Sequence, residues 1–241
     1  FYRGLIQVQK GLNFLNQLDF KRGAALLTEG MAILENQTSP DFAFAILGGR
    51  YALAESFARL GRVHDAKAWA RKITAVPDGP GVSHLQARAY ASSLAGDWQL
   101  HHGDRIRALA LLVDGVARAR ALAAPSDVLV GSSRDLARAY VELGRWPEAL
   151  ALLEETLPRL QTDPLGGGVH LLRFDVRFLL ARSLDAVGGD ARRAAALAGE
   201  ALAEVSRLSP YDLLTRQNGI DTWLAKHPPK SAADRTETTA Q

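Results

Sequence analysis

The residues that could carry out chemistry in this sequence are few and widely separated. His101, His102 and Asp104 are of the types that bind metal ions. Adjacent residues on a helix point about 100° apart, so we interpret the two histidines as an exposed pair at a helix end. The segment 81–85 begins like the Gly-x-Ser-x-Gly turn that carries a catalytic serine, but Leu85 stands where the second glycine is needed.

Other catalytic motifs are missing from the sequence. It contains neither the phosphate loop Gly-x-x-x-x-Gly-Lys-Ser/Thr nor the metalloprotease pair His-Glu-x-x-His. The glycine run at 166–168 has no strand before it, which favours a linker. The chain has no cysteine, and therefore no disulfide, thiolate ligand or cysteine nucleophile. We expect no catalytic residue, no metal site and no cofactor in this chain.

A repeated pattern organises the rest of the sequence. Gly23, Ala66, Ala108, Ala149 and Ala194 each open an apolar run after a turn, at steps of 43, 42, 41 and 45 residues. A fixed period of this size is typical of stacked supersecondary units.

Each unit has the composition of a helical hairpin. The segment 53–66 reads Leu-Ala-x-x-Phe, then Leu-Gly-Arg, then Asp-Ala; the segment 136–149 reads Leu-Ala-x-x-Tyr, then Leu-Gly-Arg, then Glu-Ala. The small residue lets two helices approach closely, the aromatic residue fills the space between them, and the glycine ends the first helix. One hairpin cannot bury its own apolar face, so the hairpins must stack.

These motifs resemble the tetratricopeptide repeat (TPR), over most of the chain. The period exceeds the usual value of about 34 residues, as in the long-helix subclass found in kinesin light chains and in the sensor arms of bacterial signalling ATPases and transcription activators. The resemblance implies an all-α fold, a right-handed α-solenoid of five stacked hairpins with a C-terminal capping helix. An ordinary helical bundle with accidental periodicity is the alternative.

Proline- and glycine-rich junctions divide the chain. We expect repeats at residues 1–37, 39–76, 82–123, 126–161 and 169–207, and a capping helix over 209–225. The buried stripe of that helix is predicted to be Tyr211, Leu213, Leu214, Ile220 and Trp223, with Asp212 facing water. The polar segment 226–241 is predicted to be disordered.

Charge and hydropathy exclude several function classes. The net charge is +3, but no block of five or more basic residues occurs, so neither nucleic acid nor an anionic membrane surface is an expected partner. No stretch of about 18 residues is apolar enough to span a membrane. A cytoplasmic location agrees with the lack of cysteine. The chain begins at Phe1 without a signal-peptide pattern, and we expect it to be a piece of a longer polypeptide.

The TPR resemblance also implies where a partner binds. The first helices of successive TPR units line a concave groove, and the corresponding positions here are Tyr51, Glu55, Arg59, Tyr90, Asp97, Arg134, Arg138, Phe178 and Arg182. Tyrosine and arginine supply anchors and charge-assisted hydrogen bonds. Arg134, Arg138 and Arg182 could meet an acidic peptide or a terminal carboxylate. The alternative is that these arginines form a solvated helix face paired with Asp and Glu.

The function predicted from the sequence is a non-catalytic protein-interaction scaffold or sensor arm in a bacterial signalling protein. Its partner would be a protein or peptide of acidic character, or an upstream domain of the same polypeptide. The Lys/Asn carboxylate clamp of chaperone-binding TPR proteins is absent, since Tyr51 and Glu55 occupy two of its places. The segment 177–224 resembles the C-terminal ends of TPR arms on bacterial Ser/Thr protein kinases. The alternative function is therefore the regulatory C-terminal region of such a kinase or of a signalling ATPase.

Overall fold

The computed structural model describes residues 2–37, 39, 42–76, 82–122, 127–162 and 169–227. Its regular elements, in chain order, are α1 (Tyr2–Asn16), α2 (Phe20–Leu34), α3 (Ala43–Arg59), α4 (Val63–Ile73), α5 (Val82–His102), α6 (Arg105–Arg120), α7 (Asp127–Glu142), α8 (Trp146–Thr156), α9 (Arg159–Thr162), α10 (Val169–Ala186), α11 (Ala191–Leu202), η2 (Val205–Arg207) and α12 (Pro210–Lys226). No strand occurs in these ranges.

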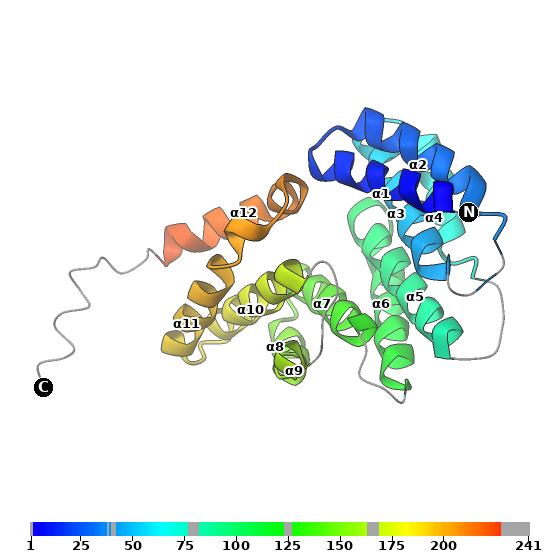
Figure 1. The fold of residues 1–241 in the computed structure, drawn as a ribbon. Helices are drawn as coiled ribbons and strands as arrows, with labels where there is room; N and C mark the ends of the chain where they lie inside the picture. Colours follow the sequence, from blue (N-terminus) through cyan, green and yellow to red (C-terminus); the bar gives the residue numbers. More distant parts are fainter. Residues whose placement is uncertain are drawn as a thin grey trace, which may run out of the picture.

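The helices form hairpins that stack in an arc. The pairs are α1/α2, α3/α4, α5/α6, α7/α8 and α10/α11, and each hairpin contacts the next along the chain. Figure 1 shows the arc running from α1 and α2 through α5 and α7 to α10 and α11. The predicted all-α solenoid of helical hairpins is confirmed. Its first helices α3, α5, α7 and α10 also contact one another in that order.

Left-handed backbone at the hairpin turns ends the first helix of most units. Gly61, Gly144 and Gly188 have φ values of 73°, 71° and 69°, a conformation that glycine adopts without steric cost. In the first unit Leu18 takes the same role with φ 64°. Each turn is closed by the backbone N–H of the next residue, which donates to the carbonyl five residues earlier, as from Asp19 to Phe14 at 2.9 Å and from Arg62 to Phe57 at 2.8 Å.

Small residues let the paired helices approach closely. Ala54, Ala137 and Ala181 are completely buried at equivalent positions of three first helices. At Gly96, the equivalent position of the third unit, an added Cβ would lie 2.6 Å from the Leu112 side chain. A larger residue at these positions would push the hairpins apart.

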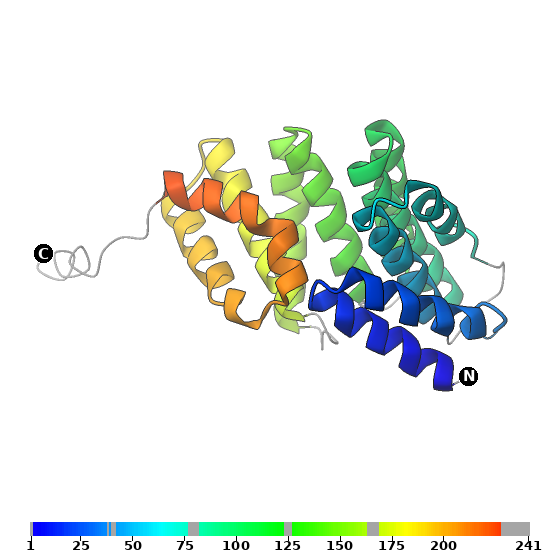
Figure 2. The ribbon, with the colours of Figure 1, turned by 90° about the horizontal axis from the view of Figure 1, so that it is seen from above.

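The C-terminal helix α12 does more than cover the last hairpin. Its first turn reaches the N-terminal end of α2, where the Tyr211 and Phe20 rings meet edge to face with centroids 6.2 Å apart. Figures 1 and 2 show α12 returning toward the α1–α2 turn. Trp223 is buried as predicted, but Leu214 is 45% exposed. The reason is that this end of α12 faces a cavity instead of a packed surface.

The ends of α12 also differ from expectation. Asp212, predicted to face water, is half-buried and forms a reciprocal capping box with Ser209. The helix extends to Lys226, and the His227 ring stacks on Trp223 with centroids 4.3 Å apart. The remainder of the predicted tail lies outside the described residues.

Candidate functional site: a charged cavity on the concave face

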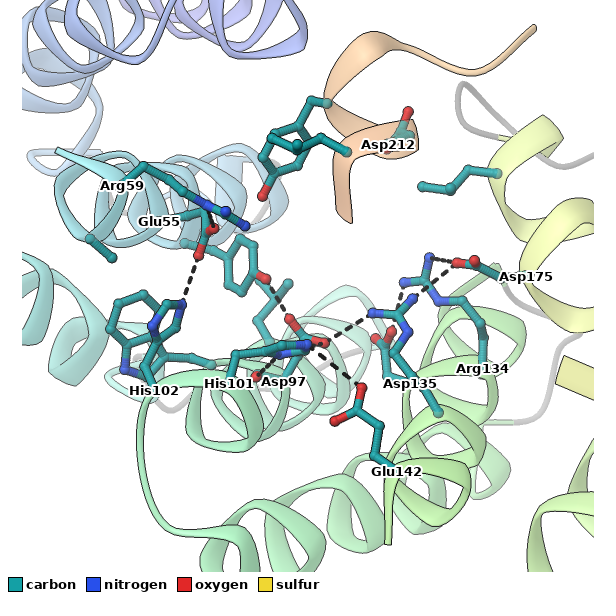
Figure 3. A pocket seen from close by; sticks show the side chains of 18 of the residues that line it. Glu55, Arg59, Asp97, His101, His102, Arg134, Asp135, Glu142, Asp175 and Asp212 are labelled. Atoms are coloured by element: carbon teal, nitrogen blue, oxygen red, sulfur yellow. Dashed lines mark hydrogen bonds and ion pairs between the residues drawn. The ribbon is translucent and has the colours of Figure 1, made fainter. Parts of the chain in front are cut away.

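The arc encloses a cavity of about 870 Å³. Its walls come from the first helices of four units, α3, α5, α7 and α10, with further residues from α4 and α12. The lining is mixed: Phe174, Phe178 and Leu179 supply apolar surface, and charged side chains supply the rest. Figure 3 shows these charged side chains pointing toward one another across the cavity.

A network of ion pairs joins three helices in the cavity wall. Arg138 of α7 donates to Asp97 of α5 at 3.3 Å and to Asp175 of α10 at 3.0 Å. Arg134, one turn earlier on α7, donates to Asp175 at 3.3 Å and lies 2.8 Å from Asp135. The three aspartates are 10% exposed or less at the side chain. The network therefore places two cations against three carboxylates, largely out of contact with water (Figure 3).

Burial and neighbouring charge move the pKa values of these carboxyl groups in opposite directions. Burial tends to raise the Asp97 pKa, but Arg138, His101 and the Tyr51 hydroxyl outweigh it and hold that pKa below its usual value. Burial raises the pKa of Asp135, and the charge of Asp97 adds to this effect. Asp97 is thus held as a carboxylate, whereas Asp135 takes up a proton more readily than a solvated aspartate.

Tyr51 and Asp97 form a hydrogen bond between α3 and α5. The Tyr51 hydroxyl donates to an Asp97 carboxylate oxygen. Burial raises the pKa of Tyr51 well above its usual value, and the negative charge of Asp97 raises it further. The hydroxyl therefore stays protonated and serves as a donor.

A second charged cluster lies at the α3 and α5 edge of the cavity. The Glu55 carboxylate accepts from Arg59 at 2.7 Å and lies 3.0 Å from the His102 ring nitrogen Nε2. Burial tends to raise the Glu55 pKa, but His102 and Arg59 hold it below its usual value. The His102 ring stacks on Trp98 with centroids 4.1 Å apart. His102 is an exposed residue at the end of α5, as expected, and it also forms part of the cavity wall.

Arg182 of α10 differs from the other arginines of the wall. No acidic side chain among the described residues lies within ion-pair distance of it, and its guanidinium is 5.8 Å from the centre of the Trp146 ring. Burial lowers the pKa of Arg182, and only the more distant Glu142 opposes this effect. The guanidinium remains charged at neutral pH, because even a lowered arginine pKa lies far above 7. Arg182 is thus a partly desolvated cation on the cavity wall that lacks a counter-ion in the described part of the chain.

The structure brings together all but one of the residues predicted for the groove. Tyr51, Glu55, Arg59, Asp97, Arg134, Arg138, Phe178 and Arg182 all line the cavity. Tyr90 does not; its ring packs on Phe44 with centroids 5.4 Å apart. Tyr90 lies about two turns before Asp97 on α5, beyond the end of the cavity, because the α5 residues that line it begin at Leu94.

Several cavity residues were missed in the sequence. Asp135 and Asp175 complete the ion-pair network, and His101 and His102 line its edge. A signal for Asp175 was present: it precedes Phe178 by three residues and Arg182 by seven, which places all three on one helix face. Asp135, adjacent to Arg134, has no such spacing signal.

The arrangement changes what the cavity can bind. Arg134 and Arg138, expected to meet an acidic partner, are already paired with aspartates, and their side chains are half-buried, at 17% and 19% exposure. Arg182 remains the one arginine of the predicted acidic-partner set that is free to pair with a ligand among the described residues. The cavity presents both donors and acceptors, which suits a polar ligand with amide groups better than a uniformly acidic one.

Within the described ranges, no group of three or more His, Asp or Glu side chains is arranged to hold a metal ion. None of the helices that the structure describes is both long and apolar enough to cross a membrane.

Comparison with known proteins identifies the class of fold. No protein-family model and no curated protein matches this sequence. Two crystal structures of a Podosopora anserina protein assigned as a kinesin light chain, with nearly identical TPR-like repeats, are similar in structure. A single-substitution variant has a TM-score of 0.56 and 20% identity, covering 83% of this chain and 93% of the other. The second structure has a TM-score of 0.54 and 21% identity, covering 83% and 94%. The chain thus has a TPR-like repeat fold, as the sequence motifs predicted.

Proposed function

We propose that this chain is a protein-interaction module that binds an extended polypeptide segment in the concave cavity. The observation that carries the proposal is the convergence of charged and polar side chains from four separate hairpins on one cavity. Stacking the hairpins requires only apolar contacts. Burying charges costs desolvation energy that apolar packing would avoid, so the charged wall supports a role in recognition.

The size and the chemistry of the cavity favour a segment of polypeptide as ligand. A volume of about 870 Å³ lies toward the upper end of the roughly 300–1,000 Å³ of ligand-binding clefts. Its lining offers carboxylates, guanidiniums and aromatic faces along successive helices. A peptide carries amide donors and acceptors at a regular spacing. Its donors could pair with the carboxylates and its acceptors with the guanidiniums. Arg182 supplies the place for one acidic side chain of that segment.

Two sources of the segment fit this proposal. One is another protein, as expected for an interaction scaffold or sensor arm in bacterial signalling. The other is an upstream domain of the same polypeptide, as the sequence resemblance to kinase arms implies. A cytoplasmic location, a partner of partly acidic character and a regulatory role beside a kinase or signalling ATPase are parts of this proposal.

Site-specific photo-crosslinking tests the proposal. Leu214, at the cavity, and Val113 of α6 are almost equally exposed, at 45% and 44%, and only Leu214 lines the cavity. A benzoylphenylalanine at position 214 should capture a partner from a native extract that position 113 does not capture. Arg182→Glu should abolish this crosslink, whereas Arg192→Glu, at an exposed position on α11, should leave it unchanged.

Two results would contradict the proposal. One is capture of the same proteins from both positions, and the other is a crosslink at position 214 that survives Arg182→Glu. If the segment belongs to the same polypeptide, the crosslink should form within the full-length protein and compete with any external partner.

A further inference from the structure

A second cavity, of about 340 Å³, lies between α4 and α6 and is floored by α5. It is separate from the charged cavity but shares Lys67, Trp98 and His102 with it. Its other lining residues are Ala70, Arg71, Thr74, Ala95, Gln99, Gly103, Arg107 and Leu111. We call it the flank groove.

The flank groove concentrates unpaired positive charge. Lys67 and Arg71 are four residues apart on one face of α4, and Arg107 faces them from the first turn of α6. Among the described residues none of these three side chains makes an ion pair. No acidic residue belongs to the described lining of the groove.

Some exposed arginines elsewhere are paired within the chain, as Arg62 is with Asp65 at 2.6 Å and Arg145 with Glu148 at 2.8 Å. The three cations of the groove are not paired in this way within the part of the chain that the structure describes. Three like charges in one small groove repel one another, and each of them would gain a counter-ion from a bound anion.

Two acidic groups that adjoin lining residues of the groove already have hydrogen-bond partners. Asp104 caps α6 and accepts from the backbone N–H groups of Ile106 and Arg107. Glu55 is bound by Arg59 and His102. Glu55 is therefore already paired with cations, and Asp104, which keeps its negative charge, directs Oδ1 at the α6 backbone.

The groove also offers neutral groups for orienting a ligand. Gln99 accepts from the Asp104 backbone through its side-chain oxygen at 3.2 Å, and its amide nitrogen has no partner among the described residues. The Thr74 hydroxyl, just after α4, lies 3.4 Å from the Arg71 carbonyl to which it donates, and Leu111 and the buried Trp98 provide apolar surface. A bound anion would therefore meet cations, an amide donor and a hydroxyl within one site.

We propose that the flank groove binds a phosphoryl group carried on a phosphorylated serine or threonine side chain of a peptide. A phosphoryl group carries almost two negative charges near pH 7 and three acceptor oxygens. It thereby matches three cations and additional donors better than a carboxylate, which has one charge and two oxygens. The groove is too small for a run of phosphates, so a nucleic-acid backbone fits less well than a single group.

The proposal does not depend on the ligand of the charged cavity. The shared residues Lys67, Trp98 and His102 would nevertheless let one peptide occupy both sites.

Titration with O-phosphoserine, followed by NMR of the full chain, tests the inference. The Trp98 indole N–H and the Arg71 and Arg107 side-chain N–H signals should shift saturably, with a Kd on the order of 1–10 mM for so small a probe. Arg71→Ala combined with Arg107→Ala should weaken binding at least about tenfold, because two charge-assisted contacts are lost. The matched control, Arg192→Ala, removes an exposed arginine from α11 and should leave the titration unchanged.

Comparison ligands separate the possible outcomes. Inorganic phosphate should give the same shifts, because it shares the phosphoryl chemistry, and serine should give none. Equal binding of glutamate would overturn the preference for a phosphoryl group. Tighter binding of a thymidine oligonucleotide, lost in the same double variant, would overturn the assignment to a phosphopeptide. Failure of Arg182→Glu to affect the crosslink described above would refute the charged-cavity proposal alone, because this titration involves no protein partner.

Discussion

The ion-pair network of the charged cavity makes a prediction that separates two neighbouring carboxylates. Asp97→Asn and Asp135→Asn each remove one negative charge and keep the side-chain shape. Asp97 accepts hydrogen bonds from Arg138 and Tyr51, and its lowered pKa keeps it ionised. Among the described residues, Asp135 forms an ion pair with Arg134 alone, and its pKa is raised. The two substitutions should therefore differ in their effect on stability.

The magnitudes follow from what each arginine retains. Removing one partner of a buried ion pair costs about 3–5 kcal/mol when the remaining charge is left alone. After Asp97→Asn, Arg138 keeps Asp175 at 3.0 Å, so we expect the lower end, about 3 kcal/mol of unfolding free energy. After Asp135→Asn, Arg134 keeps Asp175 at 3.3 Å, and the carboxylate that is lost is the one whose ionisation is opposed by burial and by the charge of Asp97. We expect a change of less than about 1 kcal/mol, in either direction.

The pH dependence of each effect has a definite sign. The folded-state pKa of Asp97 is lowered, so its stabilisation is present at pH 7 and is lost as the pH falls through that pKa, below about 4. The loss of unfolding free energy caused by Asp97→Asn should therefore become smaller in acid. The folded-state pKa of Asp135 is raised, so its ionisation destabilises the fold as the pH rises through that pKa. Any gain from Asp135→Asn should be present at pH 7 and absent at low pH.

Urea unfolding followed by circular dichroism, at a series of pH values, measures both variants. Equal losses for the two substitutions at pH 7 would refute the reasoning, because the network would then not distinguish its carboxylates. A loss of unfolding free energy in Asp97→Asn that becomes larger in acid would also refute the reasoning.

Three further predictions concern the fold. Leu18→Gly should raise the unfolding free energy by about 1 kcal/mol, because a leucine at φ 64° is strained; a loss in urea unfolding would show that its side-chain contacts outweigh the strain. Gly30→Ala should lower the unfolding free energy by about 1–3 kcal/mol, since its Cβ would lie 2.8 Å from a backbone oxygen of α1. Gly131→Ala should raise it by about 0.5–1 kcal/mol, because a Cβ at that position meets open space. A double-mutant cycle of Phe20→Leu and Tyr211→Leu should give a coupling of about 0.5–1.5 kcal/mol, and no measurable coupling would mean that α12 does not rest on the first hairpin.

Much of the fold could be predicted from the sequence because its physical requirements are local. A glycine at the turn, a small residue at the helix crossing and an aromatic one turn later define the second and fourth hairpins most clearly. Leu18 shows where this fails: it takes the left-handed conformation that glycine takes in three other units. Only the repeat period, not the residue type, indicates that position.

The candidate site was predicted in part, because spacing along one helix is local whereas pairing between helices is not. Residues four apart on one helix face could be placed from spacing, whereas the partners of Arg134 and Arg138 were not assigned. The ion pairs join residues 37 to 41 positions apart, and the Tyr51–Asp97 bond spans 46. These separations are close to the repeat period, because equivalent faces of successive first helices adjoin. Charge complementarity at one repeat's distance was therefore a usable signal in the sequence.

The position of α12 changes how the stability of this solenoid should be understood. In an open solenoid each repeat contacts only its neighbours, so stability is a sum of local and nearest-neighbour contributions. Here α12 contacts both the last hairpin, through Phe178 and Trp223, and the first, through Phe20 and Tyr211. Opening the contact with the first hairpin would widen the charged cavity, because Tyr211 and Leu214 form part of its wall. Ligand entry and the coupling between the two ends of the chain should therefore respond to the same contact.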